Sequence, residues 1–161
     1  MRNYFTLFVV VTFCVLAIFF NSCSSSSEDD NPIPKNTFVV NGVQYSAAHM
    51  GYIENDDLTI TLYFGDAEYD KASKSICITV SANSPQEGHY FYGNSSTTNN
   101  VMHSALYKTI EGDKITEYTN ITKGTITMIK FDYHYIVNYE LTIGGYIISG
   151  HHMGIFSLID L

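Results

Sequence analysis

The chain has 161 residues, with 16 acidic and 8 basic side chains and a formal net charge of −8 at pH 7. Arg2 is its only arginine, so the chain lacks the cationic surface and the planar guanidinium groups with which proteins bind phosphate and read bases. We therefore predict no nucleic-acid partner. The acidity would also repel anionic lipid head groups, so attachment to a membrane would need a separate anchor.

The N-terminal segment has the pattern of a signal peptide. Arg2 is followed by residues 4–20, a run without charged side chains, and a short basic start before an apolar run is typical of secretory leaders. The run is close to the shortest length that spans a bilayer as a helix, so a retained single-pass anchor is the alternative. No basic cluster follows the run, and small polar residues lead to Cys23. We therefore predict that residues 1–22 are cleaved off.

The residues around Cys23 resemble the lipobox of bacterial lipoproteins. In that family a diacylglyceryl group is attached to the cysteine thiol, and a dedicated peptidase cuts the chain directly before the cysteine. Ser22 fits the small residue of the pattern, whereas Phe20 and Asn21 depart from its commonest form. The resemblance implies that acyl chains such as palmitate on Cys23 make the membrane a partner of this chain.

Residues 23–35 are predicted to form a disordered tether that starts at the lipidated cysteine, because they are rich in serine, acidic residues and proline. The stretch directly after Cys23 resembles the lipoprotein export signal of Bacteroidetes, and it consists of Ser24, Ser25, Ser26, Ser27, Glu28, Asp29 and Asp30. The resemblance implies a place in the outer membrane, facing the cell surface, with the periplasmic face as the alternative. A solvated linker without any signal would have the same composition.

From Phe38 onward the sequence has the pattern of β-strands. Apolar and polar residues alternate over residues 58–64, 75–81 and 133–143, and a period of two buries one face of a strand. Turn signals separate the strands: Asn41-Gly42 favours a type I′ hairpin, and Gly144-Gly145 follows the third of these runs. The pattern predicts about ten short strands and no helix.

Residues 36–161 are enough for one all-β domain with its own core. We predict a single antiparallel β-sandwich, with a flattened meander β-barrel as the alternative. Short connections over residues 124–161 indicate an antiparallel meander, and the apolar last residues should form a paired strand. Ile126 and Met128 share a face with Lys130, which predicts a bulge or a strand that leaves the sheet.

The domain also resembles, in three short segments, small all-β domains of Bacteroidetes lipoproteins. These segments are Gly88-His89-Tyr90, residues 124–127 and Gly154-Ile155-Phe156. They are common β-strand signals, and the resemblance implies no known activity.

Candidate metal ligands are present but not at a ligand spacing. His151 and His152 are neighbours, which would point to opposite faces of a strand. Asp66, Glu68 and Asp70 alternate and could bind a hard cation such as calcium, but they lack the glycine-bearing loop of an EF-hand. We therefore predict no metal site and no cofactor.

The sequence contains no motif for nucleophilic catalysis. It has no Gly-x-Ser-x-Gly elbow, and Cys77 lies mid-strand without a basic neighbour that would lower its pKa. We therefore assign no catalytic residue and favour a protein that is not an enzyme. A small envelope hydrolase acting on glycans remains the rival class, since two carboxylates could meet in a cleft.

Tyrosine is the enriched residue type, with 13 Tyr and no Trp. Tyr90 and Tyr92 flank Phe91 and share one face of a strand. Exposed rings there could stack on a sugar or a peptide, and packing within the sheet is the alternative. The leading prediction is a non-enzymatic surface binding or interaction module for an unknown glycan or peptide ligand. A third possibility is a β-barrel carrier of an apolar ligand, which would need an enclosed cavity.

Overall fold

The computed structural model describes residues 36–93 and 100–161, which belong to one compact unit. In these ranges the chain forms 12 strands and no helix, so the prediction of an all-β fold is confirmed. No helix of the described part has the length and hydropathy that a membrane span requires. The strands are β1 (Thr37–Val40), β2 (Val43–Ser46), β3 (His49–Glu54), β4 (Thr59–Gly65), β5 (Lys74–Ser81), β6 (Gly88–Tyr92), β7 (Val101–Glu111), β8 (Lys114–Tyr118), β9 (Ile121–Phe131), β10 (His134–Ile143), β11 (Tyr146–Gly154) and β12 (Ser157–Leu158).

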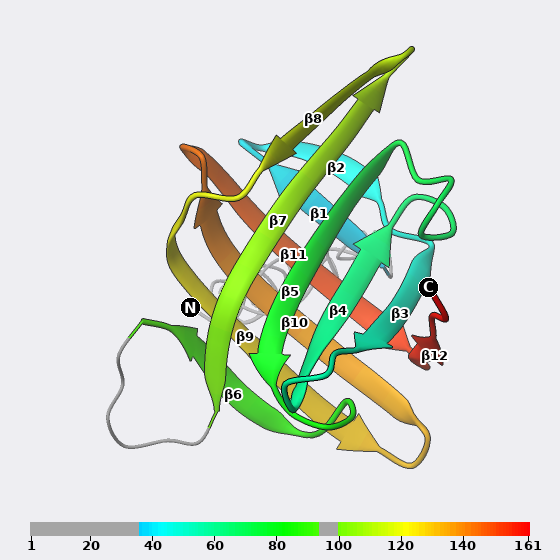
Figure 1. Cartoon of the computed structure of the whole chain (residues 1–161), viewed down its shortest axis with the longest axis vertical. Helices are drawn as coiled ribbons and strands as arrows, with labels where there is room; N and C mark the ends of the chain where they lie inside the picture. Colours follow the sequence, from blue (N-terminus) through cyan, green and yellow to red (C-terminus); the bar gives the residue numbers. More distant parts are fainter. Residues whose placement is uncertain (1–35, 94–99) are drawn as a thin grey trace, which may run out of the picture. The chain divides into compact units, whose positions relative to one another are not determined.

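These strands form one curled sheet with the shape of a half-barrel (Figure 1). The order is β12-β3-β4-β5-β7-β6-β9-β10-β11-β1-β2, and β8 pairs with β7 beside this path. The pairs β6–β7 and β3–β12 are parallel, whereas the other pairs are antiparallel. The two layers are therefore halves of one mixed sheet, because β6 pairs with both β7 and β9 and joins them. This arrangement is nearer to the flattened barrel than to two separate sheets of a sandwich.

Two tight turns set the register of the hairpins. Asn41 and Gly42 have φ values of 49° and 83°, and they connect β1 to β2. Gly144 and Gly145 have φ values of 57° and 85°, and they connect β10 to β11. Positive φ at both central residues is the signature of a type I′ turn, so the predicted hairpins are confirmed.

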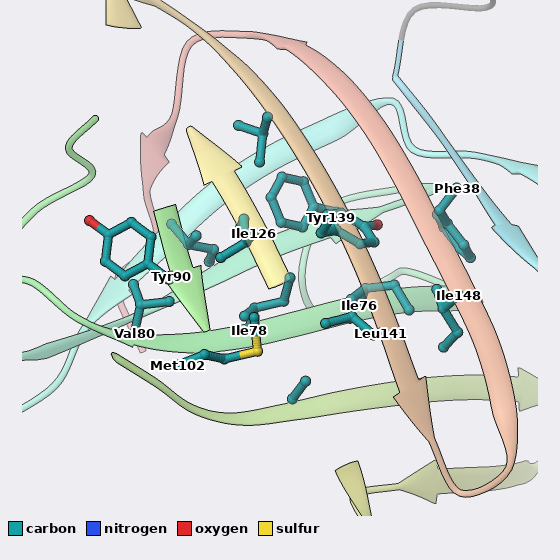
Figure 2. Packing of buried hydrophobic residues seen from close by; sticks show 14 of the residues in the cluster. Phe38, Ile76, Ile78, Val80, Tyr90, Met102, Ile126, Tyr139, Leu141 and Ile148 are labelled. Carbon is teal, nitrogen blue, oxygen red and sulfur yellow. The ribbon is translucent and has the colours of Figure 1, made fainter. Parts of the chain in front are cut away.

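The core lies between the two layers of the sheet, where side chains from facing strands meet (Figure 2). The rings of Phe64 on β4 and Tyr139 on β10 lie 5.2 Å apart, centroid to centroid. Each large apolar side chain that is fully buried stabilises the fold by roughly 1.5–3 kcal/mol relative to exposure. The alternation predicted for β10 is confirmed, and its buried residues are Tyr135, Val137, Tyr139, Leu141 and Ile143.

Two strand predictions need correction. Leu58 is 73% exposed with a φ of 61°, so it lies in the turn and β4 starts one residue later. The irregularity of β9 lies opposite Thr142 and not near Lys130. Lys130 simply extends past the core, with its Nζ 5.5 Å from the ring centroid of Tyr135.

The C-terminal part departs from the predicted meander after β11. Strands β9, β10 and β11 are antiparallel neighbours, as expected. The chain then crosses to the other layer, where β12 pairs in parallel with β3 and the amide of Ile159 donates to the carbonyl of Tyr52 at 2.8 Å. The prediction that the apolar ending includes a paired strand is confirmed.

Candidate functional site

A hollow of about 220 Å³, which we call the tyrosine hollow, opens between strands of both layers. Six strands contribute to it, because the curl of the sheet brings β1, β2 and β11 opposite β5, β7 and β8. Its lining combines aromatic rings with a few polar groups: Val40, Asn41, Tyr45, Lys74, Tyr107, Thr109, Glu111, Tyr118 and Tyr146.

Three packed tyrosine rings form one wall of the tyrosine hollow. Tyr107 and Tyr118 are cross-strand partners on β7 and β8, and their rings stack with centroids 5.7 Å apart. The ring of Tyr146 lies 4.7 Å from that of Tyr118, and its hydroxyl donates to the Tyr118 hydroxyl at 3.2 Å. Gly144 lets these rings approach, since a Cβ there would lie 3.1 Å from the ring of Tyr118. Such aromatic pairs contribute about 0.5–1.5 kcal/mol beyond their buried area, so the wall is a firm surface.

The polar groups of the tyrosine hollow are left free to bind. No described residue exchanges a hydrogen bond with the hydroxyls of Tyr45, Tyr107 and Thr109, and within that part of the chain Lys74 and Glu111 have no ion pair. Polar groups in a concave site are usually satisfied when a ligand binds. Three hydroxyls and one carboxylate therefore converge without a protein partner, beside the Lys74 ammonium.

Burial keeps the hydroxyl of Tyr107 neutral. Desolvation raises the pKa of Tyr107 to about 12, and the neighbouring Tyr45 adds to this shift. The Lys74 ammonium lies 5.2 Å from the ring centroid of Tyr45, a cation–π contact. Near neutral pH the hollow therefore offers hydroxyl donors, flat rings and one cation.

The structure corrects the predicted ligand contact at Tyr90. This side chain is fully buried in the core, where its hydroxyl donates to the carbonyl of Gln86 at 3.4 Å. Its ring is therefore part of the packing and cannot meet a ligand. Tyr92 lies at the end of β6, beyond the core, and is 38% exposed. The two tyrosines do not form a common surface.

The lipid site Cys23 and the export-signal residues lie outside the described residues. The same holds for the rest of the signal peptide and the tether, residues 1–35. These predictions therefore stay predictions.

The neighbouring histidines lie on opposite faces of β11, as predicted. His151 Nδ1 lies 2.6 Å from Asn138 Oδ1 on the outer face. His152 is fully buried and stacks on Phe64 with centroids 4.3 Å apart, and its Nε2 lies 3.2 Å from the Tyr139 hydroxyl. The two imidazoles therefore cannot ligate one ion together. In the described part no three His, Cys, Asp or Glu side chains form a group that could hold a metal ion.

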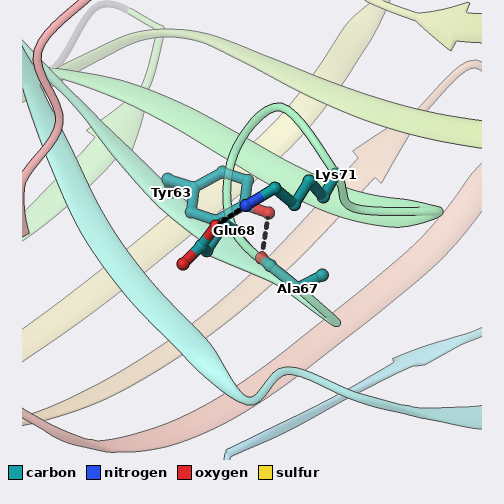
Figure 3. Close-up of polar contacts among 4 residues, drawn as sticks. All are labelled: Tyr63, Ala67, Glu68 and Lys71. Carbon is teal, nitrogen blue, oxygen red and sulfur yellow. Dashed lines mark hydrogen bonds and ion pairs between the residues drawn. The ribbon is translucent and has the colours of Figure 1, made fainter.

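The acidic loop after β4 uses its carboxylates for its own structure (Figure 3). Glu68 forms an ion pair with Lys71, and the hydroxyl of Tyr63 donates to the Ala67 carbonyl at 2.6 Å. Asp66 accepts hydrogen bonds from the side chain of Ser73 and, at 3.2 Å, from a backbone amide. These contacts fix the loop over β4 and leave fewer oxygens for a cation. A hollow of about 340 Å³ beside this loop is lined by residues of the loop, β3 and the C-terminal segment.

Cys77 packs beneath the same loop with Tyr63 and Ala72. Burial raises the pKa of its thiol to about 12. Because the thiolate is the reactive form, Cys77 is unreactive near neutral pH.

No family model, no curated protein and no solved structure matches this chain. The tyrosine hollow is therefore identified from its geometry. The abundance of tyrosine was the only sequence signal that pointed toward it. Residues 45, 107, 118 and 146 have no informative spacing, because pairing between distant strands brings them together.

Proposed function

We propose that this chain is a cell-envelope lipoprotein whose β-sheet body is a non-enzymatic binding module, and that the tyrosine hollow is its ligand site. The observation that carries the proposal is the set of unpartnered hydroxyls of Tyr45, Tyr107 and Thr109 beside a wall of packed rings. Ring faces stack on the apolar face of a sugar, and the hydroxyls can exchange hydrogen bonds with sugar hydroxyls. The hollow is smaller than sites of roughly 300–1,000 Å³ that enclose larger ligands. We therefore propose a single carbohydrate unit of a glycan as the ligand.

The lipoprotein part of the proposal rests on the order of sequence features at the N-terminus. A basic start, an apolar run and a polar junction precede Cys23, and serine and acidic residues follow it. We propose that lipid on Cys23 holds the protein in the outer membrane, with the body on the cell surface. One part of the hollow supports this arrangement, because Tyr146 lies at the end of β11 that is remote from the start of the body.

Strand β11 gives the distance between Tyr146 in the hollow and the residue at which the chain enters the body. Tyr146, its first residue, lines the hollow, whereas the amide of Met153 donates to the side-chain oxygen of Asn36 at 2.6 Å. Met153 follows Tyr146 by seven residues of extended strand, which is roughly 23 Å. The chain therefore enters the body at one end of β11, and the lining of the hollow extends from Val40 and Tyr45 on β1 and β2 to Tyr146 at the other end of β11.

A binding experiment tests the ligand site. We would screen the purified protein against an array of bacterial and host glycans and measure the affinity of the best ligand by titration calorimetry. Tyr118→Ala removes the central ring of the wall and should weaken binding about tenfold or more, a loss of about 1.4 kcal/mol. Tyr133→Ala is the matched control, because Tyr133 is 75% exposed and lies outside the hollow. Equal affinities of both variants and the wild type would contradict the proposed site.

The same preparation distinguishes the rival functions. A hydrolase would shorten the bound glycan during incubation, which mass spectrometry detects. A carrier would retain an apolar molecule in a native mass spectrum. In the described part, side chains of both layers fill the space between them (Figure 2), which favours a surface site over an enclosed one.

Cys23→Ala tests the anchor. We expect the variant to leave the detergent phase during phase partitioning after expression in a related bacterium, while its circular dichroism stays that of a β protein. Unchanged partitioning would show that residues 4–20 are a retained anchor. Ser22→Ala keeps a small residue before the cysteine and is the control.

A further inference from the structure

An apolar patch lies on the outer face of the sheet, at the turn between β9 and β10. We call it the end patch, and it comprises Ile129, Phe131, Tyr133, Ile136 and Met153. Ile136 is the cross-strand partner of both Ile129 and Met153, so these three side chains form a row across the three strands. Phe131 lies two residues after Ile129 on the same face, and Tyr133 occupies the turn. The exposed fractions are 45% for Ile129, 46% for Phe131 and 75% for Tyr133.

The core does not require these side chains. The inward residues of β9 and β10 already fill the interior, and the end patch points to the other side of the same strands. Grouped apolar side chains in water cost free energy, and such groups commonly mark an interaction surface.

The end patch differs from the rest of the chain in charge. The whole chain has a formal net charge of −8, yet the turn beside the patch carries one cation and one anion, Lys130 and Asp132. His134 stacks on Phe131 with centroids 5.6 Å apart. The patch is therefore nearly neutral, and a surface without net charge suits it better than an anionic one.

The chain enters the body next to the end patch. Asn36, the first described residue, accepts a hydrogen bond from the amide of Met153, a member of the patch. Twelve residues lie between Cys23 and Asn36, and the fully extended chain from one to the other spans at most about 45 Å. A lipid on Cys23 would thus keep the patch within reach of the bilayer.

We propose that the end patch docks on the zwitterionic lipid surface of the membrane in which Cys23 is anchored, an inference that rests on the proposed lipid anchor. Phe131 and Ile129 enter the boundary between head groups and acyl chains, and Tyr133 lies at the head-group level, where amphipathic rings are favoured. Lys130 extends its ammonium toward water. Docking adds a second attachment to the lipid and orients the body with the tyrosine hollow away from the membrane.

Single tryptophans test this inference, because the chain contains none. The full lipidated chain would carry Phe131→Trp in the end patch, or Ile147→Trp as the matched control. Ile147 is 70% exposed on the outer face of β11, beside Tyr146 at the far end of the strand. Each variant is reconstituted into phosphatidylcholine vesicles with and without brominated lipid. Sedimentation with the vesicles measures anchoring, and tryptophan emission measures docking.

We expect both variants to sediment with the vesicles. Emission of Phe131→Trp should shift to shorter wavelength and lose intensity in brominated lipid, whereas emission of Ile147→Trp should not change. Adding phosphatidylglycerol to the vesicles should reduce the quenching. Sedimentation without quenching at residue 131, or equal quenching at both residues, would overturn the docking and leave the anchor intact. Failure of both variants to sediment would overturn the anchor itself. Phe131→Trp combined with Tyr133→Ser should sediment fully with weaker quenching, and unchanged quenching there would also contradict the inference.

Discussion

The phenol ring of Tyr139 lies directly over Gly150, its cross-strand partner on β11. A Cβ at residue 150 would come within 2.2 Å of the ring carbon Cζ and within 2.6 Å of Cε1. Glycine therefore provides the space that this ring occupies. The same ring then reaches His152, whose imidazole stacks on it with centroids 5.4 Å apart. One missing side chain on β11 thus permits an aromatic stack in the core.

Gly150→Ala should destabilise the fold by roughly 1–3 kcal/mol, because the added methyl group displaces the Tyr139 ring within a packed core. Urea unfolding followed by circular dichroism measures this change. Gly154→Ala on the same strand is the control, since its nearest contact would be Met50 Sδ at an ordinary 3.4 Å. Equal losses in both variants would mean that the ring can move aside without cost.

Stability should depend on pH through His152. Burial, and to a smaller extent the nearby His151, lowers the pKa of His152 from 6.5 to about 3. The unfolded chain takes up this proton below about pH 6.5, whereas the native state takes it up only near pH 3. The neutral imidazole of His152 therefore makes its full contribution to the free energy of unfolding above pH 6.5. Between pH 6.5 and pH 3 this contribution falls by about 1.4 kcal/mol for each pH unit.

The variant His152→Leu tests whether His152 causes this pH dependence of stability. It has no proton to gain, so its free energy of unfolding should change less than that of the wild type between pH 7 and pH 5. His103→Gln, at an exposed position, should retain the dependence of the wild type. If His152→Leu and the wild type lose equal stability, other groups cause the acid sensitivity.

Local features of this fold were predictable from the sequence, whereas the pairing of distant strands was not. Asn41 and Gly42 specify a hairpin through their own backbone preferences, and the alternation along β10 requires only a buried face. The parallel pairing of β6 with β7 depends on how the whole sheet curls. The tyrosine hollow depends on the same curl, since Tyr45 and Tyr107 are far apart in the chain and meet only in the finished sheet. The prediction that Tyr90 contacts a ligand was wrong because two residues on the same face of a strand can differ in burial: Tyr90 lies in the core, whereas Tyr92 lies beyond it.

Cys77 should resist alkylation in the native protein. Its thiol is buried and its raised pKa of about 12 keeps it protonated, so iodoacetamide at pH 8 should leave the peptide that contains residue 77 unmodified. Denaturation should make the labelling complete. Peptide mass spectrometry measures both states, and rapid labelling of the native protein would show that the loop above Cys77 opens readily.

Replacement of Glu28, Asp29 and Asp30 by alanine should leave Cys23 lipidated and abolish display on the cell surface. Lipid attachment depends on residues at and before the cysteine, whereas the acidic triplet resembles the export signal that follows it. Protease treatment of intact cells, with antibody detection of the body, measures display. The exposed Asp113→Ala is a control for the loss of an acid. Equal digestion of the wild type and the triplet variant would show that the acidic triplet is only part of a linker. Protection of both proteins would place the body in the periplasm.

The order in which strands find their partners has a consequence for how this protein is made. Thr37 of β1 pairs with His151, and Gly51 of β3 pairs with Ser157. The first strands of the body therefore complete their pairing only after the last strands have been made. Pairing residues so far apart in the chain closes long loops, which makes folding slow. If the chain is exported as we propose, most of it must pass the translocation channel before the sheet can close. Premature folding on the inner side, which would block passage, is thereby delayed by the topology itself.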